Sequence, residues 1–179
     1  MQKPVRVAVI GAGKLGKRHA EVYSKLPGVE LVGVCDIHED RSRESAHHCR
    51  TQAFTDHREL LGKVDAASIV VPSEKHYVIS KDFLAHGANL LIEKPITTRL
   101  DEADELLKLA RDRSLILQVG HIERFTSAMR TIKSIIQNPR FIECHRLGPY
   151  DPRVADVGVT LDLMIHDIDI VLNLVKSPV

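Results

Sequence analysis

Short apolar runs that favour β-strands alternate with helical patterns over residues 1–119, and this alternation restricts the chain to few folds. It is typical of right-handed βαβ units on a parallel sheet. Several of the runs are almost wholly apolar, as expected where helices cover both faces of a sheet. We therefore predict a doubly wound α/β domain over residues 1–120. The predicted strands are 5–10, 30–35, 66–71, 89–92 and 115–119, and the predicted helices are 14–26, 39–49, 57–62, 75–86 and 99–112.

The pattern changes after Gly120. A helix is predicted at 126–137, a strand at 141–147, a Gly-Pro turn at 148–149 and a long apolar helix over about 157–175. One strand cannot form a sheet by itself, because its edges would stay unpaired. We therefore expect residues 121–179 to be the truncated start of a second domain.

Composition excludes several classes of function. The chain has 25 Lys and Arg against 24 Asp and Glu, with no Trp, 3 Tyr and 4 Phe, so neither a basic surface nor many stacking platforms for nucleic acid are expected. No apolar run is long enough to span a bilayer, and the apolar N-terminal stretch is too short for a signal peptide. The three cysteines show no C-x-x-C spacing. We expect a cytoplasmic protein that binds neither membrane nor nucleic acid.

A G-x-G-x-x-G motif, Gly-Ala-Gly-Lys-Leu-Gly from Gly11, follows the first predicted strand and begins a predicted helix. Gly11 permits the tight turn, Gly13 leaves room for a pyrophosphate, and Gly16 lets the helix lie close to the strand. Backbone N–H groups at the start of the helix, around Lys14 and Leu15, then bind the phosphates. This context favours a Rossmann-type dinucleotide-binding domain.

Asp36 ends the second predicted strand, 25 residues after Gly11, where an acidic side chain hydrogen-bonds ribose hydroxyls. A carboxylate there repels a 2′-phosphate, so NAD is predicted over NADP. Two alternatives stay open: Asp36 as the cap of the following helix, and Arg41 and Arg43 as partners of a 2′-phosphate.

Glu93, Lys94 and Pro95 follow the strand predicted at 89–92, at the edge of the sheet where open α/β folds bind ligands. Proline restricts the residue before it, so Lys94 is expected to be extended and close to the cofactor. The alternative is an ordinary solvated lysine paired with Glu93.

The long C-terminal helix carries a narrow polar stripe at spacings of i, i+4, i+7 and i+11 on an otherwise apolar helix. The stripe faces either solvent or a polar cavity, because buried ionisable groups need partners. Asp162 and His166, one turn apart, can couple into an imidazole base whose proton affinity a carboxylate adjusts. No further ligands at metal-binding spacing complete a metal site, so none is predicted. The stripe consists of Asp162, His166, Asp169 and Asn173.

In combination these segments resemble the Gfo/Idh/MocA family of nicotinamide-dependent oxidoreductases. The resemblance rests on the glycine motif, Asp36, Val71-Pro72-Ser73 followed by His76, Glu93-Lys94-Pro95, and D-x-x-x-H at Asp162 and His166. It implies a Rossmann domain followed by a larger α+β domain with an antiparallel sheet, which also mediates homo-oligomers. It also implies oxidation or reduction of a hydroxyl carbon on sugars, cyclitols or nucleotide-sugars. Residues 120–125 and 162–169 resemble the branch that oxidises the 3-hydroxyl of UDP-N-acetylhexosamines.

The resemblance also implies the roles of individual residues. The catalytic group is Lys94, Asp162 and His166. The substrate-binding residues are His121, Arg124 and Asp169. The cofactor-binding residues are Gly11, Gly13, Lys14, Leu15, Gly16, Asp36, Val71, Pro72, His76, Glu93 and Lys94.

Oxidation of a carbinol needs one base for the hydroxyl proton and one cation for the developing alkoxide. We assign the base to His166 and the cation to Lys94, and these two roles can be exchanged. The alternative function is a non-catalytic NAD(H)-binding or dimerisation module. For these 179 residues alone we expect cofactor binding without efficient turnover, because the groups that enclose the substrate are missing.

Overall fold

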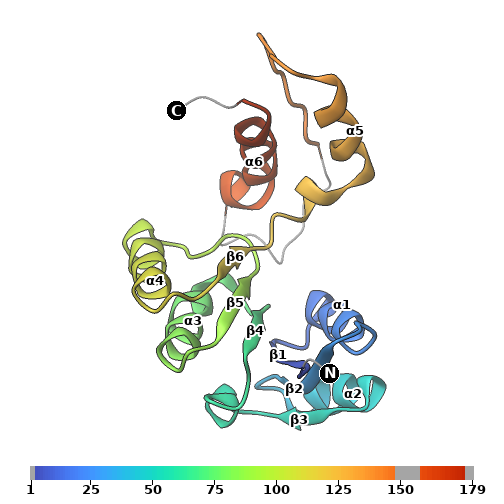
Figure 1. Ribbon diagram of the computed structural model, residues 1–179, viewed down its shortest axis with the longest axis vertical. Coiled ribbons are helices and arrows are strands. Elements are labelled where there is room, and N and C mark those ends of the chain that lie inside the picture. The colour runs from blue at the N-terminus through green and yellow to red at the C-terminus, as the bar shows by residue number, and fades with distance from the viewer. Residues whose placement is uncertain (1–2, 148–157, 176–179) are drawn as a thin grey trace. The chain divides into compact units, whose positions relative to one another are not determined.

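A computed structural model describes residues 3–147 and 158–175 of the chain. The chain divides into two compact units, Met1–Val119 and Gly120–Val179, whose elements are labelled in Figure 1.

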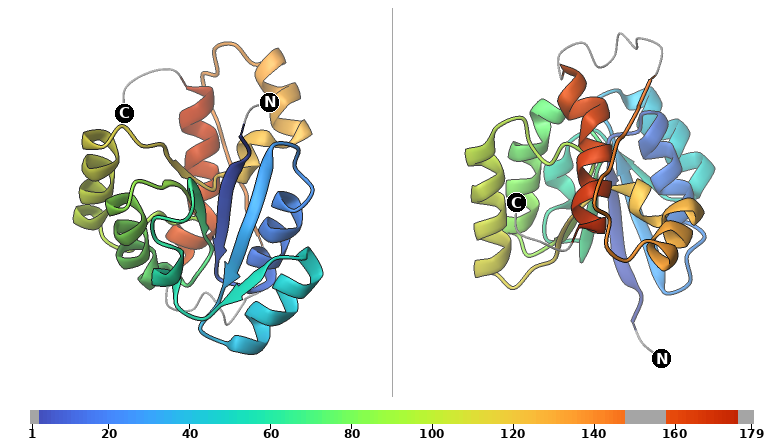
Figure 2. Two further views of the ribbon diagram at one scale, coloured as in Figure 1. Left: turned by 60° about the horizontal axis from the view of Figure 1, so that its bottom comes forward. Right: turned by 90° about the horizontal axis from the view of Figure 1, so that it is seen from above.

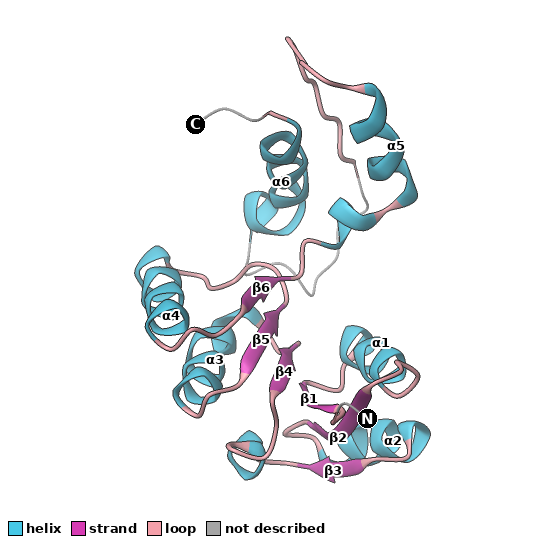
Figure 3. Ribbon diagram, in the orientation of Figure 1, coloured by secondary structure: helices cyan, strands magenta, loops and turns pink. Residues whose placement is uncertain are grey.

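The first unit is built on one six-stranded parallel sheet with the order β3-β2-β1-β4-β5-β6 (Figure 3). The order runs outward in both directions from the centre, so the chain crosses over between the two halves after β3. This is the doubly wound Rossmann topology that the sequence predicts. The strands are β1 (Val5–Ile10), β2 (Val29–Cys35), β3 (Gln52–Phe54), β4 (Ala66–Ile69), β5 (Asn89–Ile92) and β6 (Leu117–Val119).

Helices cover both faces of this sheet. α1 and α2 lie on one face, and α3 and α4 lie on the other (Figures 1 and 2). A parallel sheet needs this double cover, because its strands carry apolar side chains on both faces. The helices are α1 (Lys14–Tyr23), α2 (Glu39–Cys49), α3 (His76–Ala85) and α4 (Leu100–Asp112).

The apolar core forms two clusters, one on each face of the sheet. Ala8 and Ile10 of β1 belong to the cluster under α3 and α4, which includes Phe83 and Leu106. Val9 of β1 belongs to the cluster under α1. Successive residues of the central strand thus point to opposite faces, as the strand period requires.

Within the first unit, one strand was not predicted and one predicted helix is wrong. β3 (Gln52–Phe54) was not predicted, because it is a short, mostly exposed edge strand without an apolar run. It is held on β2, where the ring of Phe54 covers Gly33 at a position where a side chain would collide with it. The helix predicted at 57–62 is instead a 3₁₀ turn, His57–Leu60. Asp56 precedes the turn and caps it, because its carboxylate accepts a hydrogen bond from the backbone N–H of Arg58.

The second unit contains a 3₁₀ turn at Ile122–Phe125, helix α5 (Ser127–Ile135) and helix α6 (Ile165–Leu174). Thr126 caps α5 by accepting a hydrogen bond from the backbone N–H of Met129. A π-helical turn, Thr160–Met164, precedes α6, so the helix predicted over 157–175 is not uniform.

The strand predicted at 141–147 is wrong, because these residues have no regular secondary structure and are largely exposed. Within the described residues no neighbouring strand offers them hydrogen bonds, and a lone strand is unstable. The Gly-Pro turn predicted at 148–149 lies outside the described residues. Over the described ranges, no helix has the length and apolarity that crossing a membrane requires.

Candidate functional site

All six strands of the first unit end in register, and residues of the predicted site follow four of them, β1, β2, β4 and β5. β1 is the shared neighbour, since Ile10 pairs with Cys35 of β2 and with Ile69 of β4, which in turn pairs with Ile92 of β5. The residues that follow these ends therefore lie along one edge of the sheet. These residues are Gly11, Asp36, Val70 and Glu93.

The three glycines of the motif have different surroundings. A Cβ at Gly11 would lie 2.2 Å from the carbonyl oxygen of Val70, and φ is +101° there. A Cβ at Gly16 would lie 1.8 Å from the carbonyl oxygen of Gly11, so helix and strand pack too closely for any side chain. A Cβ at Gly13 would meet nothing within 4 Å. Gly11 and Gly16 thus have a packing reason to lack side chains, whereas the space beside Gly13 is open.

Helix α1 begins directly after Gly13, and no side chain caps its first turn. The first turn contains no acidic residue, and the side chains of Lys14 and Leu15 are exposed. Its backbone N–H groups and the positive end of the helix dipole are therefore available to an anion.

The half-buried carboxylate of Asp36 joins the glycine motif to the segment after β2. Its Oδ2 accepts the backbone N–H of Ala12 at 2.7 Å, and its Oδ1 accepts the backbone N–H of His38 at 2.9 Å. The Asp36 side chain is thereby fixed beside the motif rather than extended into solvent.

His76, predicted to bind the cofactor, is 1% exposed and lies at the start of α3. Its Nε2 is 2.9 Å from the carbonyl oxygen of Val71, and its Nδ1 is 2.8 Å from the carbonyl oxygen of Pro95. The ring thus links the segments that follow β4 and β5. Pro72, beside Val71, is exposed and precedes a 3₁₀ turn at Ser73–Lys75.

Glu93 is held by a buried polar network that the sequence did not reveal. His19 of α1 places Nε2 3.2 Å from the Glu93 carboxylate and Nδ1 3.3 Å from Ser68 Oγ, and Tyr23 Oη is 2.8 Å from Ser68 Oγ. These contacts can all be hydrogen bonds in one chain: Tyr23 donates to Ser68, Ser68 donates to His19, and His19 donates to Glu93. The chain needs only one N–H on the imidazole of His19.

Burial disfavours the charged form of Glu93. Hydrogen bonds from His19 and from the backbone N–H of Lys94, together with the nearby charges, nevertheless hold the pKa of Glu93 below its ordinary value. Lys94 follows at once, half-buried, and its peptide bond to Pro95 is cis. Glu93 is therefore an anion fixed next to Lys94.

In the second unit, Asp169 and Arg124 bind each other. Arg124 Nε donates to Asp169 Oδ2 at 2.7 Å and Nη2 also donates to the same carboxylate, while His121 Nδ1 lies 3.8 Å from Asp169 Oδ1. Asp169 is 5% exposed, so its charge needs this partner, and hydrogen bonding to Asp169 raises the pKa of Arg124. All three residues predicted to bind substrate therefore lie in one cluster.

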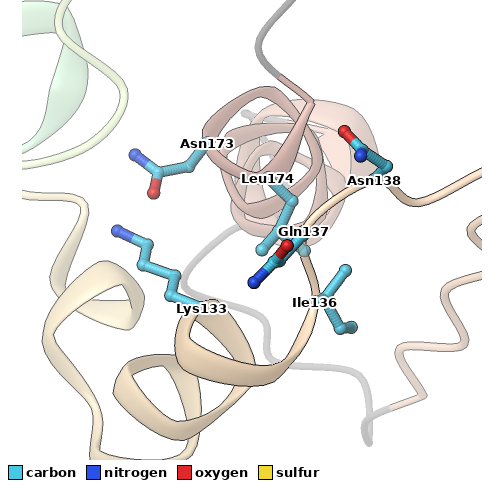
Figure 4. Close-up of a pocket in the computed structure, with 6 residues that line it drawn as sticks. All are labelled: Lys133, Ile136, Gln137, Asn138, Asn173 and Leu174. Atoms are coloured by element: carbon cyan, nitrogen blue, oxygen red, sulfur yellow. The ribbon is translucent and has the colours of Figure 1, made fainter.

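The polar stripe on the C-terminal helix does not face a single environment. Asp162 lies in the π-helical turn and His166 in the first turn of α6, both half-buried, whereas Asp169 is buried against Arg124. Asn173 lines a cavity of about 620 Å³ between the ends of α5 and α6 (Figure 4). The other lining residues are Lys133, Ile136, Gln137, Asn138 and Leu174.

A second arginine also ties α6 to the 3₁₀ turn. Arg146 Nε donates to both carboxylate oxygens of Asp167 at 3.0 Å, and its Nη1 is 3.9 Å from Glu123. Two arginine–carboxylate pairs, Arg124–Asp169 and Arg146–Asp167, thus hold the helix that carries His166. The sequence offered little to find Arg146, since it lies in a segment without periodicity.

The model of the oxidoreductase family with an NAD-binding Rossmann fold, Gfo/Idh/MocA, matches residues 5–121. The chain belongs to this oxidoreductase family. The match covers the six strands and the glycine motif of the first unit. It confirms the family and the fold predicted from the sequence.

Relatives of the chain include dehydrogenases of a nucleotide-sugar and of an inositol. The chain is 40% identical to UDP-N-acetylglucosamine 3-dehydrogenase from Acidithiobacillus ferrooxidans, over 95% of this chain and 54% of the relative. A crystal structure of that enzyme has a TM-score of 0.90 with 39% identity, over 98% of this chain and 58% of the other. Myo-inositol 2-dehydrogenase from Thermotoga maritima is 28% identical, over 92% of this chain and 53% of the relative. The chain thus spans about half the length of these curated relatives.

Within this family, the structure adds residues to those predicted from the sequence. His19 and Ser68 lie behind Glu93, and Arg146 lies behind Asp167. His19 lies three residues after Gly16 on α1, a spacing that by itself gives no indication of its contact with Glu93.

Proposed function

We propose that the chain carries the cofactor-binding part and catalytic residues of an NAD-dependent oxidoreductase acting on a hydroxyl carbon of a sugar or nucleotide-sugar. The observation that carries the proposal is the placement of Lys94 two residues after β5, at the edge of the sheet where the glycine motif follows β1. The 40% identity to UDP-N-acetylglucosamine 3-dehydrogenase favours the 3-hydroxyl of UDP-N-acetylglucosamine as the reacting group.

The residues at this edge fit a dinucleotide. The space beside Gly13 allows a pyrophosphate to approach the backbone, and the uncapped first turn of α1, from Lys14, offers N–H donors. Asp36 lies where a ribose is held in this fold. When bound, the nicotinamide exchanges a hydride with the substrate carbon.

We assign the catalytic roles to Lys94, Asp162 and His166. His166 accepts the proton of the substrate hydroxyl, and the ammonium of Lys94 stabilises the developing alkoxide. Asp162 orients the imidazole. Arg124 and His121 contribute hydrogen bonds to the substrate, and Asp169 holds Arg124 in place through its two carboxylate oxygens.

We propose NAD rather than NADP as the cofactor. The carboxylate of Asp36 would face a 2′-phosphate, and Arg43, one of two arginines near enough in sequence to pair with that phosphate, binds Glu39 at 2.5 Å. Titration calorimetry should therefore give a lower Kd for NAD than for NADP, and Asp36→Ala should reduce the difference. A lower Kd for NADP in the unmodified chain would contradict this assignment.

The reaction is tested in two steps. NAD binding is measured with this chain, and NADH formation from NAD and UDP-N-acetylglucosamine is followed with this chain and with a chimera that appends the remaining C-terminal part of the Acidithiobacillus enzyme. We expect binding in both and turnover in the chimera, lost in its Lys94→Ala and His166→Ala variants. Binding without turnover in the chimera would favour the non-catalytic module, and no binding would reject both functions.

We further propose a homo-oligomer in the cytoplasm. None of the three cysteines, Cys35, Cys49 and Cys144, forms a disulfide, which is consistent with a reducing compartment. Light scattering of the chain and of the chimera tests the oligomer.

A further inference from the structure

Histidine side chains hold the residues on both sides of Lys94. Before it, the Glu93 carboxylate is 3.2 Å from His19 Nε2. After it, the carbonyl oxygen of Pro95 is 2.8 Å from His76 Nδ1. His19 belongs to α1 and His76 to α3, which cover opposite faces of the sheet. The backbone at Lys94 is therefore restrained from both faces.

On the α1 side, one carboxylate links the histidine to Lys94. Glu93 accepts hydrogen bonds from His19 and from the backbone N–H of Lys94. The side chains of His19 and Glu93 are only 17% and 12% exposed, so water has little access to replace a lost contact. Removing the donor of His19 would release the group that fixes the Lys94 backbone.

On the α3 side, the restraint is a link between two strand ends. His76 contacts the carbonyl oxygens of Val71 and Pro95 and is 1% exposed. Carbonyl oxygens only accept hydrogen bonds and a neutral imidazole has one N–H, so the ring donates to one of these carbonyl groups, while its other nitrogen lies against the second one and is closed off from ligands. The contacts of His76 therefore fit a role in positioning and not in proton transfer.

We propose that His19 and His76 are positioning residues for Lys94, each acting through the residue next to Lys94 in the chain. The inference rests on the proposed catalytic role of Lys94 and adds two residues from outside the reacting groups. It predicts that the two histidines use different ring nitrogens for this task, Nε2 at His19 and Nδ1 at His76.

Amide variants separate the two ring nitrogens. Glutamine places its amide nitrogen near the position of Nε2, and asparagine places it near that of Nδ1. His19→Gln should therefore keep the contact with Glu93 and His19→Asn should lose it, whereas His76→Asn should keep the contact with Pro95 and His76→Gln should lose it. General destabilisation would not produce opposite preferences at the two positions.

In the chimera described above, we expect kcat to fall about 10- to 100-fold in His19→Asn and His76→Gln, the range for a misplaced catalytic group. His19→Gln and His76→Asn should each keep several-fold more of kcat than the other variant at the same position. Thermal unfolding of each variant identifies any loss that comes from instability. Equal losses of kcat within both pairs would overturn the proposal.

A second readout needs no turnover. NMR titration of the Glu93 carboxyl group in this chain should give a higher midpoint in His19→Asn than in His19→Gln or the unmodified chain, and exchange of the Lys94 backbone amide should be faster in the same variant. Unchanged titration and exchange in His19→Asn would refute the role of His19. If the chimera turns over no sugar, the proposed function fails while this measurement still decides the contact. If the His76 variants do not fold, the His19 pair decides alone.

Discussion

The open space beside Gly13 leads to a prediction that separates binding from folding. Gly13 has φ −69° and ψ −170°, a conformation that alanine adopts freely, and its added Cβ would meet nothing within 4 Å. Alanine at a helix N-cap costs roughly 0.5–1 kcal/mol relative to glycine, and the less flexible unfolded chain recovers about 0.4–1 kcal/mol. Gly13→Ala should therefore leave the free energy of unfolding of the apoprotein almost unchanged.

Binding of NAD should respond differently. The new methyl group lies where the pyrophosphate approaches the start of α1, so one hydrogen bond from backbone to phosphate is lost, a contribution of about 1.5–3 kcal/mol. This corresponds to an increase in Kd of about 10- to 100-fold. Titration calorimetry measures the affinity, and thermal unfolding without cofactor measures the stability.

Gly16→Ala is the matched control, because its Cβ would lie 1.8 Å from the carbonyl oxygen of Gly11. Helix α1 would have to move, so this variant should lose stability by about 1–3 kcal/mol even without cofactor. A Gly13→Ala protein that binds NAD as tightly as the unmodified chain would refute the reasoning. So would one that unfolds as early as Gly16→Ala.

Three further outcomes are expected from the contacts described above. Leu106→Ala, at a fully buried position of α4, should lower the free energy of unfolding by about 2–5 kcal/mol in urea titrations, and a loss below 1 kcal/mol would contradict the core assignment. The pKa of Glu93 in the folded state lies below its unfolded value of 4.5, so its charge stabilises the fold above pH 4.5 and this contribution is lost on acidification. In Glu93→Gln, the free energy of unfolding should therefore fall less steeply as the pH is lowered. Arg124→Gln leaves the buried carboxylate of Asp169 without its arginine partner and should lower the free energy of unfolding by about 1–3 kcal/mol. Arg130→Gln, at an exposed position, should change it little, and similar midpoints of thermal unfolding for the two variants would argue against this pair.

Periodicity and glycine placement were sufficient to predict most of the first unit. β1 (Val5–Ile10), β5 (Asn89–Ile92) and α2 (Glu39–Cys49) were predicted with their observed bounds, because their ends coincide with clear changes of pattern. β3 and the 3₁₀ turn after it escaped prediction, since their conformation depends on pairing with β2 and on one cap rather than on local composition.

The residues of the candidate site divide in the same way. Asp36 and Glu93 could be placed at the sheet edge because each follows a recognisable strand. The partners His19 and Arg146 could not, because a contact across 74 residues, or 21 residues, leaves no trace in local spacing. The pairing of Arg124 with Asp169 also changes the role we give Asp169, from a direct substrate contact to support of Arg124.

Strands β1, β2, β4 and β5 end at the same level of the sheet. The length of each strand therefore determines which residue lies at the candidate site. Side chains alternate between the faces of a sheet, so one extra residue in β5 would carry Glu93 beyond its neighbours and turn it to the face opposite His19. Single-residue insertions within these four strands should therefore be far less tolerated than insertions of the same size in the turns at the other edge of the sheet.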